Sequence, residues 1–118
     1  MQEISIFLSQ YLKEMSPKNV EIYEGVFSIL KKFSLIGIKI KKEINTANLK
    51  FLSQNTGQIN KDGDFTKNLD KIADNIILKQ LKNTEVKYYA SEENEQILSI
   101  NEDGKYAVST DPLDGSSN

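Results

Sequence analysis

The residues best suited to chemistry lie in the segment Asp111-Pro112-Leu113-Asp114-Gly115-Ser116-Ser117-Asn118. Its two carboxylates, Asp111 and Asp114, supply the hard oxygen ligands that divalent cations prefer. The Gly-Ser-Ser run that follows lets the backbone approach closely and offers N–H groups to an anion. The segment therefore suits a divalent metal held beside a phosphate, although an Asp/Pro/Gly turn without such a role has the same composition.

Other acidic residues occur earlier in the chain. Glu92 and Glu93 follow one predicted strand, and Asp111 follows another. If the two strands share a sheet, their ends converge, and the gathered negative charge favours a bound cation. Asp64 and Asp70 form a third acidic group near the start of a predicted helix, where the helix dipole alone favours a carboxylate. By themselves, Glu92 and Glu93 are also compatible with a solvated acidic turn.

The composition excludes several kinds of site. The 118 residues contain no cysteine and no histidine, which rules out disulfides, thiolate chemistry and typical zinc sites. A ligand set made only of oxygen atoms favours Mg²⁺ or Mn²⁺ over zinc. The net charge is −2 and no basic patch is interleaved with aromatic residues, so we expect no nucleic acid partner. We also expect no membrane association and a cytoplasmic location, because no long apolar run or export signal is apparent.

The spacing of apolar residues predicts three helices, over residues 3–15, 17–44 and 66–83. Ser16 and Pro17 suit the start of the second helix as its cap and first residue. Gly37, inside that helix, is interpreted as a close helix contact rather than a stop. Residues 46–63, between the second and third helices, are polar and lack periodicity, which predicts a functional or mobile loop.

Alternating and β-branched residues predict three strands, over residues 86–91, 97–100 and 105–110. The segment Asn101-Glu102-Asp103-Gly104 predicts a hairpin turn between the last two strands. Because helices come first and strands after, we predict an α+β layered architecture, with N-terminal helices packed on a mixed β-sheet.

Taken together, these segments resemble class I fructose-1,6-bisphosphatase, within the lithium-sensitive, metal-dependent sugar and inositol phosphatases. The resemblance rests on Ser91-Glu92-Glu93, Gly104-Lys105-Tyr106 and the segment from Asp111 to Asn118. Upstream, Gly63-Asp64 and Leu69-Asp70 are similar to a family segment with the same spacing. The resemblance implies the sugar-phosphatase fold, with residues 1–118 as the N-terminal part of the domain.

The resemblance also implies roles for individual residues. The expected metal ligands are Glu92, Asp111, the carbonyl oxygen of Leu113, and Asp114. The expected contacts with the sugar phosphate are Asp114, Gly115, Ser116 and Ser117. The expected catalytic residues are Asp70 and Glu93, which activate the attacking water, and Asp64, which joins them when a mobile loop over residues 48–65 closes.

The activity implied is magnesium-dependent hydrolysis of the 1-phosphate of fructose-1,6-bisphosphate, in gluconeogenesis, by a homotetramer. On this reading the chain is an N-terminal piece that is inactive alone. Lys105 and Tyr106 are similar to a pair at the family's AMP effector site, although ordinary strand residues after a turn look the same. Two alternatives are a related inositol or other sugar phosphatase, and a non-catalytic oligomerisation or regulatory module.

Overall fold

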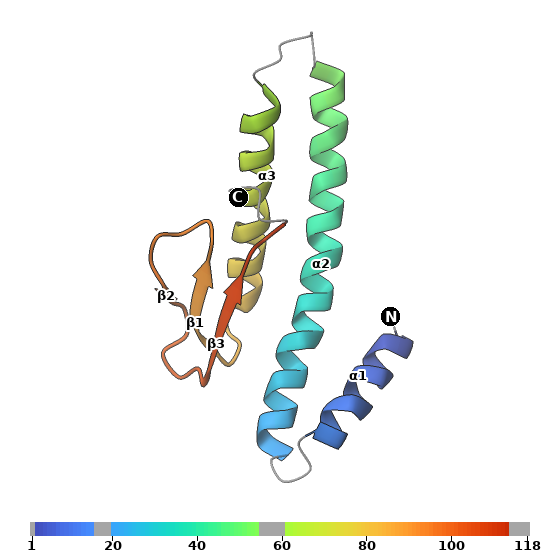
Figure 1. Cartoon of the computed structure of the whole chain (residues 1–118), viewed down its shortest axis with the longest axis vertical. Coiled ribbons are helices and arrows are strands. Elements are labelled where there is room, and N and C mark those ends of the chain that lie inside the picture. Colours follow the sequence, from blue (N-terminus) through green and yellow to red (C-terminus); the bar gives the residue numbers. More distant parts are fainter. Residues whose placement is uncertain (1, 16–19, 55–60, 114–118) are drawn as a thin grey trace.

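The computed structural model describes residues 2–15, 20–54 and 61–113. Within these residues the elements are α1 (Gln2–Met15), α2 (Val20–Gln54), α3 (Lys61–Leu81), β1 (Val86–Ser91), β2 (Leu98–Ser99) and β3 (Tyr106–Thr110). Figure 1 shows α2 and α3 side by side, with α1 against the first part of α2 and the sheet beside α3. This arrangement of helices and a small mixed sheet confirms the predicted α+β class.

The core lies where α2, α3 and β1 meet. α3 contributes one face, on which apolar residues recur every three or four positions and are buried. The buried core residues are Ile36 of α2, Ile77 and Leu81 of α3, and Val86 and Tyr89 of β1. In the part of the chain that the structure describes, none of the helices has the length and low polarity needed to cross a membrane.

α3 ends at Leu81 for local reasons. Asn83 has a φ of 61°, the left-handed conformation that asparagine tolerates better than most residues. The carbonyl oxygen of Leu81 accepts hydrogen bonds from Thr84 Oγ1 at 2.6 Å and from Asn101 Nδ2 at 2.9 Å. These side chains satisfy a backbone acceptor that the helix leaves open, and the chain turns at once into β1.

The helices are longer than predicted on either side of the loop between them. α2 continues to Gln54 and α3 begins at Lys61, so helix replaces much of the loop predicted over residues 48–65. The reason is that residues 47–54 are rich in alanine, leucine, lysine and glutamine, whose helical propensity outweighs the lack of a clear apolar stripe. Residues 55–60 of that loop and the predicted cap at Ser16 and Pro17 lie outside the described residues.

Two glycines of α2 have different surroundings. α2 passes through Gly37 without a stop, but a β-carbon at this position would meet nothing within 4 Å among the described residues, so the predicted close contact is wrong. The close contact is at Gly25, which is buried against the aromatic ring of Tyr106 in β3. Gly25 therefore lets α2 and β3 approach each other.

The sheet has the order β2-β1-β3, with β1 in the centre. β2 pairs with β1 antiparallel, and β3 pairs with β1 parallel, with Ser91 opposite Thr110. The predicted hairpin between the second and third strands is therefore wrong, because the two strands lie on opposite sides of β1. The predicted strand positions agree with β1 and lie within one residue of the ends of β2 and β3.

The connection between β2 and β3 crosses the start of β1 because its side chains and backbone bind there. Asn101 Oδ1 accepts from the N–H of Asn83 at 2.8 Å, and its amide donates to the carbonyls of Leu81 and Val86 at 2.9 and 2.5 Å. Gly104 has no room for a β-carbon, which would lie 2.5 Å from the backbone nitrogen of Lys87. These contacts hold the turn across the end of the sheet and direct β3 to the far side of β1.

Candidate active site

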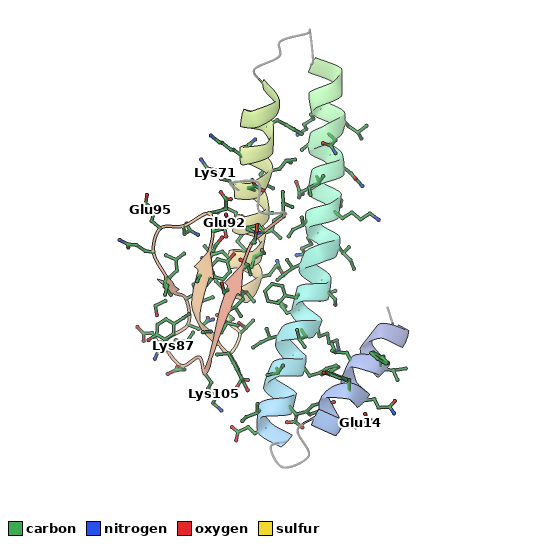
Figure 2. The ribbon with its side chains drawn as sticks, viewed as in Figure 1. Glu14, Lys71, Lys87, Glu92, Glu95 and Lys105 are labelled. Atoms are coloured by element: carbon green, nitrogen blue, oxygen red, sulfur yellow. The ribbon has the colours of Figure 1, made fainter. Side chains whose placement is uncertain are left out.

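The parallel pairing of β1 and β3 brings two acidic segments to one edge of the sheet. The N–H of Glu92 donates to the carbonyl of Thr110 at 3.2 Å, so Glu92 leaves β1 beside the point where Asp111 leaves β3. Figure 2 shows Glu92 at this edge and Lys105 at the opposite end of the sheet. The predicted convergence of the two strand ends is therefore confirmed.

The turn after β1 is held by Ser91, which is buried. Its hydroxyl oxygen accepts from the N–H of Glu93 at 3.2 Å, and its carbonyl accepts from the N–H of Asn94 at 3.1 Å. A serine hydroxyl that accepts from the residue two positions on is a common way to fix such a turn. Ser91 thus sets the direction in which the Glu92-Glu93 pair leaves the sheet.

α3 places two acidic residues beside the same edge. Asp70 and Asp74 lie one helical turn apart, on the buried face of α3, with 4% and 6% of their surface exposed. From Leu81 back to Asp74 a helix rises by about 10 Å, and from Val86 to Tyr89 a strand advances by about the same distance. Asp74 therefore lies level with Tyr89, and Asp70 lies level with the turn that follows β1.

Asp74 of α3 accepts hydrogen bonds from β1 and from the turn after β1, and through Tyr89 it is linked to β3. The hydroxyl of Tyr89 donates to Asp74 Oδ1 at 2.6 Å, and Asn94 Nδ2 donates to Asp74 Oδ2 at 3.0 Å. The Tyr89 hydroxyl also lies 2.8 Å from Thr110 Oγ1 of β3. The interpretation of the sequence missed Asp74. Its position four residues after Asp70, on the same helix face, is the signal that would have found it.

The crowding of carboxylates at this edge changes their electrostatics. The pKa of Glu93 is raised by partial desolvation first, and then by the negative charges of Asp70, Asp74 and Glu92, while Lys71 acts in the opposite direction. Burial and the bond to Asp74 raise the pKa of Tyr89 to about 12. The site thus concentrates negative charge that a cation would relieve.

The donor set of this edge suits a hard divalent cation, because it consists of carboxylate and carbonyl oxygens. Across the described ranges, no three acidic side chains already form a group with metal-binding geometry. Asp111 is exposed directly after β3, and Leu113 is partly buried two residues later. The remaining predicted ligand and substrate contacts, Asp114, Gly115, Ser116 and Ser117, lie outside the described residues.

Three further predicted residues lie away from the acidic edge or in an unexpected element. Asp64 belongs to α3 rather than to a loop. Lys105 and Tyr106, at the start of β3, are far along the strand from the acidic edge and contact α2. Lys105 Nζ lies 2.7 Å from Glu21 Oε1, and both side chains are largely exposed.

Comparison with known proteins identifies the family to which the chain is similar. The family model for the fructose-1-6-bisphosphatase N-terminal domain matches residues 6–118. A class 1 fructose-1,6-bisphosphatase of Rhizobium meliloti is 33% identical over 112 residues, which cover 94% of this chain and 32% of the relative. One from Sinorhizobium medicae is 34% identical over 113 residues, with the same coverage. One from Cereibacter sphaeroides is 51% identical over 59 residues, half of this chain and 18% of the relative.

The fold and the acidic edge define an α+β domain of the kind found in sugar phosphatases, with its carboxylates gathered where parallel strands end. With the match over residues 6–118, the chain belongs to the fructose-1,6-bisphosphatase family, and it carries that family's N-terminal domain. The chain spans about a third of the length of the rhizobial relatives it matches.

Proposed function

We propose that the protein carrying this chain hydrolyses the 1-phosphate of fructose-1,6-bisphosphate to give fructose 6-phosphate and phosphate. The observation that supports the proposal is the convergence of Glu92 and Asp111 at one sheet edge, beside Asp70 of α3, in a chain of this family. Clustered carboxylates beside an anionic substrate require a cation, and the donor set suits Mg²⁺, with Mn²⁺ as a second hard cation.

The proposed ligands of that cation are Glu92, Asp111, the carbonyl of Leu113, and Asp114. When bound, it would neutralise charge on the phosphoryl oxygens. Asp114, Gly115, Ser116 and Ser117 are proposed to contact the sugar phosphate, since their N–H and hydroxyl groups are suited to phosphate oxygens. Asp64 is proposed to complete the catalytic group from the N-terminal end of α3.

Asp70 and Glu93 are the proposed groups that hold and deprotonate the attacking water. As the water oxygen bonds to phosphorus, a carboxylate takes one water proton, and the bond from phosphorus to the C1 oxygen of the sugar breaks. The departing C1 oxygen then takes up a proton from solvent water, and the carboxylate returns its own proton to solvent. Glu93 suits this role by position, because the turn after β1 carries it close enough to Asp70 for the two charges to interact.

Membership of the family also suggests the pathway, location, oligomeric state and effector site of the full-length protein. We propose that the protein acts in gluconeogenesis, in the cytoplasm, as a homotetramer, and that Lys105 and Tyr106 belong to an effector site. Residues 1–118 alone should release no phosphate, because they span about a third of the length of the rhizobial relatives.

The test is phosphate release by the full-length gene product, with fructose-1,6-bisphosphate and with inositol monophosphate, in Mg²⁺ and in chelator. Release from the fructose substrate alone, abolished by chelator, supports the proposal. Release from inositol monophosphate alone would instead assign the protein to the related inositol phosphatases. If neither substrate is hydrolysed and Mg²⁺ does not raise the melting temperature, the chain is a non-catalytic module.

A further inference from the structure

Asp74 has the geometry of a residue that organises the acidic edge. It is a buried carboxylate on α3, and its two oxygens accept from different segments of the chain. Nothing in the proposed reaction uses it directly. Its partners are nevertheless neighbours of the proposed site residues, because Asn94 follows Glu93 in the turn after β1.

The second connection runs through Tyr89. This tyrosine is fully buried in β1, and its hydroxyl donates to Asp74 Oδ1 at 2.6 Å. The same hydroxyl lies 2.8 Å from Thr110 Oγ1, and Thr110 immediately precedes Asp111. One tyrosine oxygen therefore links α3 to the end of β3.

The two connections meet at one carboxylate and end at the two segments that carry the proposed ligands. The Asn94 branch holds the turn that bears Glu92 and Glu93, and the Tyr89 branch holds the strand end that bears Asp111. The separation between these segments decides whether their oxygens can share a cation. Partners that orient metal ligands commonly change metal affinity or activity by about 10–100-fold when they are removed.

We infer that Asp74 is a positioning residue, which acts through Asn94 and the Tyr89–Thr110 pair to hold the two ligand-bearing strand ends at the spacing that a bound cation requires. This inference rests on the proposed function, since it concerns the cation of that site. In this scheme Asp74 is not a ligand of the cation; its two oxygens accept from Tyr89 and Asn94, and it acts through them.

The test compares Tyr89→Phe with Tyr88→Phe in the full-length protein. Each substitution removes one hydroxyl from β1, but Tyr89 is buried in the network, whereas Tyr88 is 46% exposed. The binding of Mn²⁺ alone is measured by electron paramagnetic resonance, and KM and kcat are measured separately. We expect Tyr89→Phe to weaken Mn²⁺ binding by about tenfold, with kcat lowered more than KM is raised, and Tyr88→Phe to match the unsubstituted protein.

A role in stability alone would leave Mn²⁺ affinity unchanged in the folded protein, and that result would overturn the inference. If Tyr89→Phe does not fold, Asn94→Ala tests the other branch and leaves the tyrosine bonds intact. The same loss of Mn²⁺ affinity is then expected, and an unchanged affinity again overturns the inference.

Hydrogen–deuterium exchange of the metal-free protein separates this inference from the proposed function. If Tyr89→Phe loosens the strand ends, its amides at residues 91–95, where Glu92 bonds to Thr110, should exchange faster than in the unsubstituted protein. Residues 81–87, at the other end of β1, should exchange at the same rate in both. If the unsubstituted protein binds no Mn²⁺, the proposed function fails. Faster exchange confined to residues 91–95 in Tyr89→Phe would still support positioning, and uniform or unchanged exchange would overturn it.

Discussion

Gly25 of α2 lies against the aromatic ring of Tyr106 in β3, so closely that a β-carbon at position 25 would overlap the ring. Gly37 of the same helix has open space around it among the described residues. Replacing either glycine by alanine gives the same gain in intrinsic helix propensity, about 0.8–1 kcal/mol. The two positions therefore separate the effect of the contact from the effect of propensity.

Gly37→Ala should raise the free energy of unfolding by about 0.5–1 kcal/mol. Gly25→Ala should be less stable than Gly37→Ala by about 1–3 kcal/mol, because the ring of Tyr106 has to move away from α2. Denaturant unfolding of both variants measures the difference, provided that the free energy of unfolding falls with denaturant concentration at the same slope in each. Equal gains would show that Tyr106 is not held against α2 in solution.

The pKa of Tyr89 predicts how stability depends on pH in alkaline solution. Burial and the bond to Asp74 raise this pKa from 10.0 to about 12 in the folded state. The contribution of Tyr89 to stability is therefore complete below pH 10 and is lost as the pH rises through about 12. Tyr89→Phe should show a shallower loss of stability over this range, and Tyr88→Phe should not. Denaturant unfolding at several pH values tests this, and parallel curves for both variants would contradict it.

The side chain of Asn101 should matter more for stability than that of Glu102 in the same turn. Its side chain makes hydrogen bonds to the backbone of Asn83, Leu81 and Val86. Asn101→Ala should lower the free energy of unfolding by about 2–4 kcal/mol, since each such bond contributes about 0.5–1.5 kcal/mol. Glu102→Ala, at an exposed position of the same turn, should change it by less than about 0.5 kcal/mol. A loss of similar size in both variants would mean that the turn acts through its backbone alone.

Asp114 should be needed for turnover and not for folding. In the full-length protein, Asp114→Ala removes a proposed metal ligand and a phosphate contact together, so kcat/KM should fall by about 100-fold or more. Asp103→Ala is the matched control, because it removes an exposed carboxylate at the far end of the sheet. Phosphate release and circular dichroism are compared for both. Turnover close to normal in Asp114→Ala would reject its assignment as a ligand.

Local patterns in the sequence predicted the types of the elements well. Apolar spacing located α1 and the three strands to within one residue, because a buried face imposes its period on the chain, whereas α3 begins five residues before its predicted start. The end of α2 was predicted ten residues too early, since the helix there depends on propensity rather than on an apolar stripe.

Long-range features were harder to predict. The segment Asn101–Gly104 has the composition of a hairpin turn, but the chain uses it to cross the end of β1. The path of the chain here depends on hydrogen bonds from Asn101 to residues 15 and 20 positions earlier, which no local pattern shows. Asp74 was also missed, although its position one helical turn after Asp70 is visible in the sequence; its bonds to a distant strand and turn are not. By contrast, Glu92 and Asp111 were recognised as candidates, because each ends a strand.

The bond between the N–H of Glu92 and the carbonyl of Thr110 joins segments that are separate in the unfolded chain. A cation that binds across these strand ends has affinity for the folded state only, so its binding energy adds to the folding energy by mass action. At a hundred times its dissociation constant, such a cation stabilises the fold by about 2.7 kcal/mol. Thermal resistance of this protein should therefore follow the divalent-ion content of its surroundings.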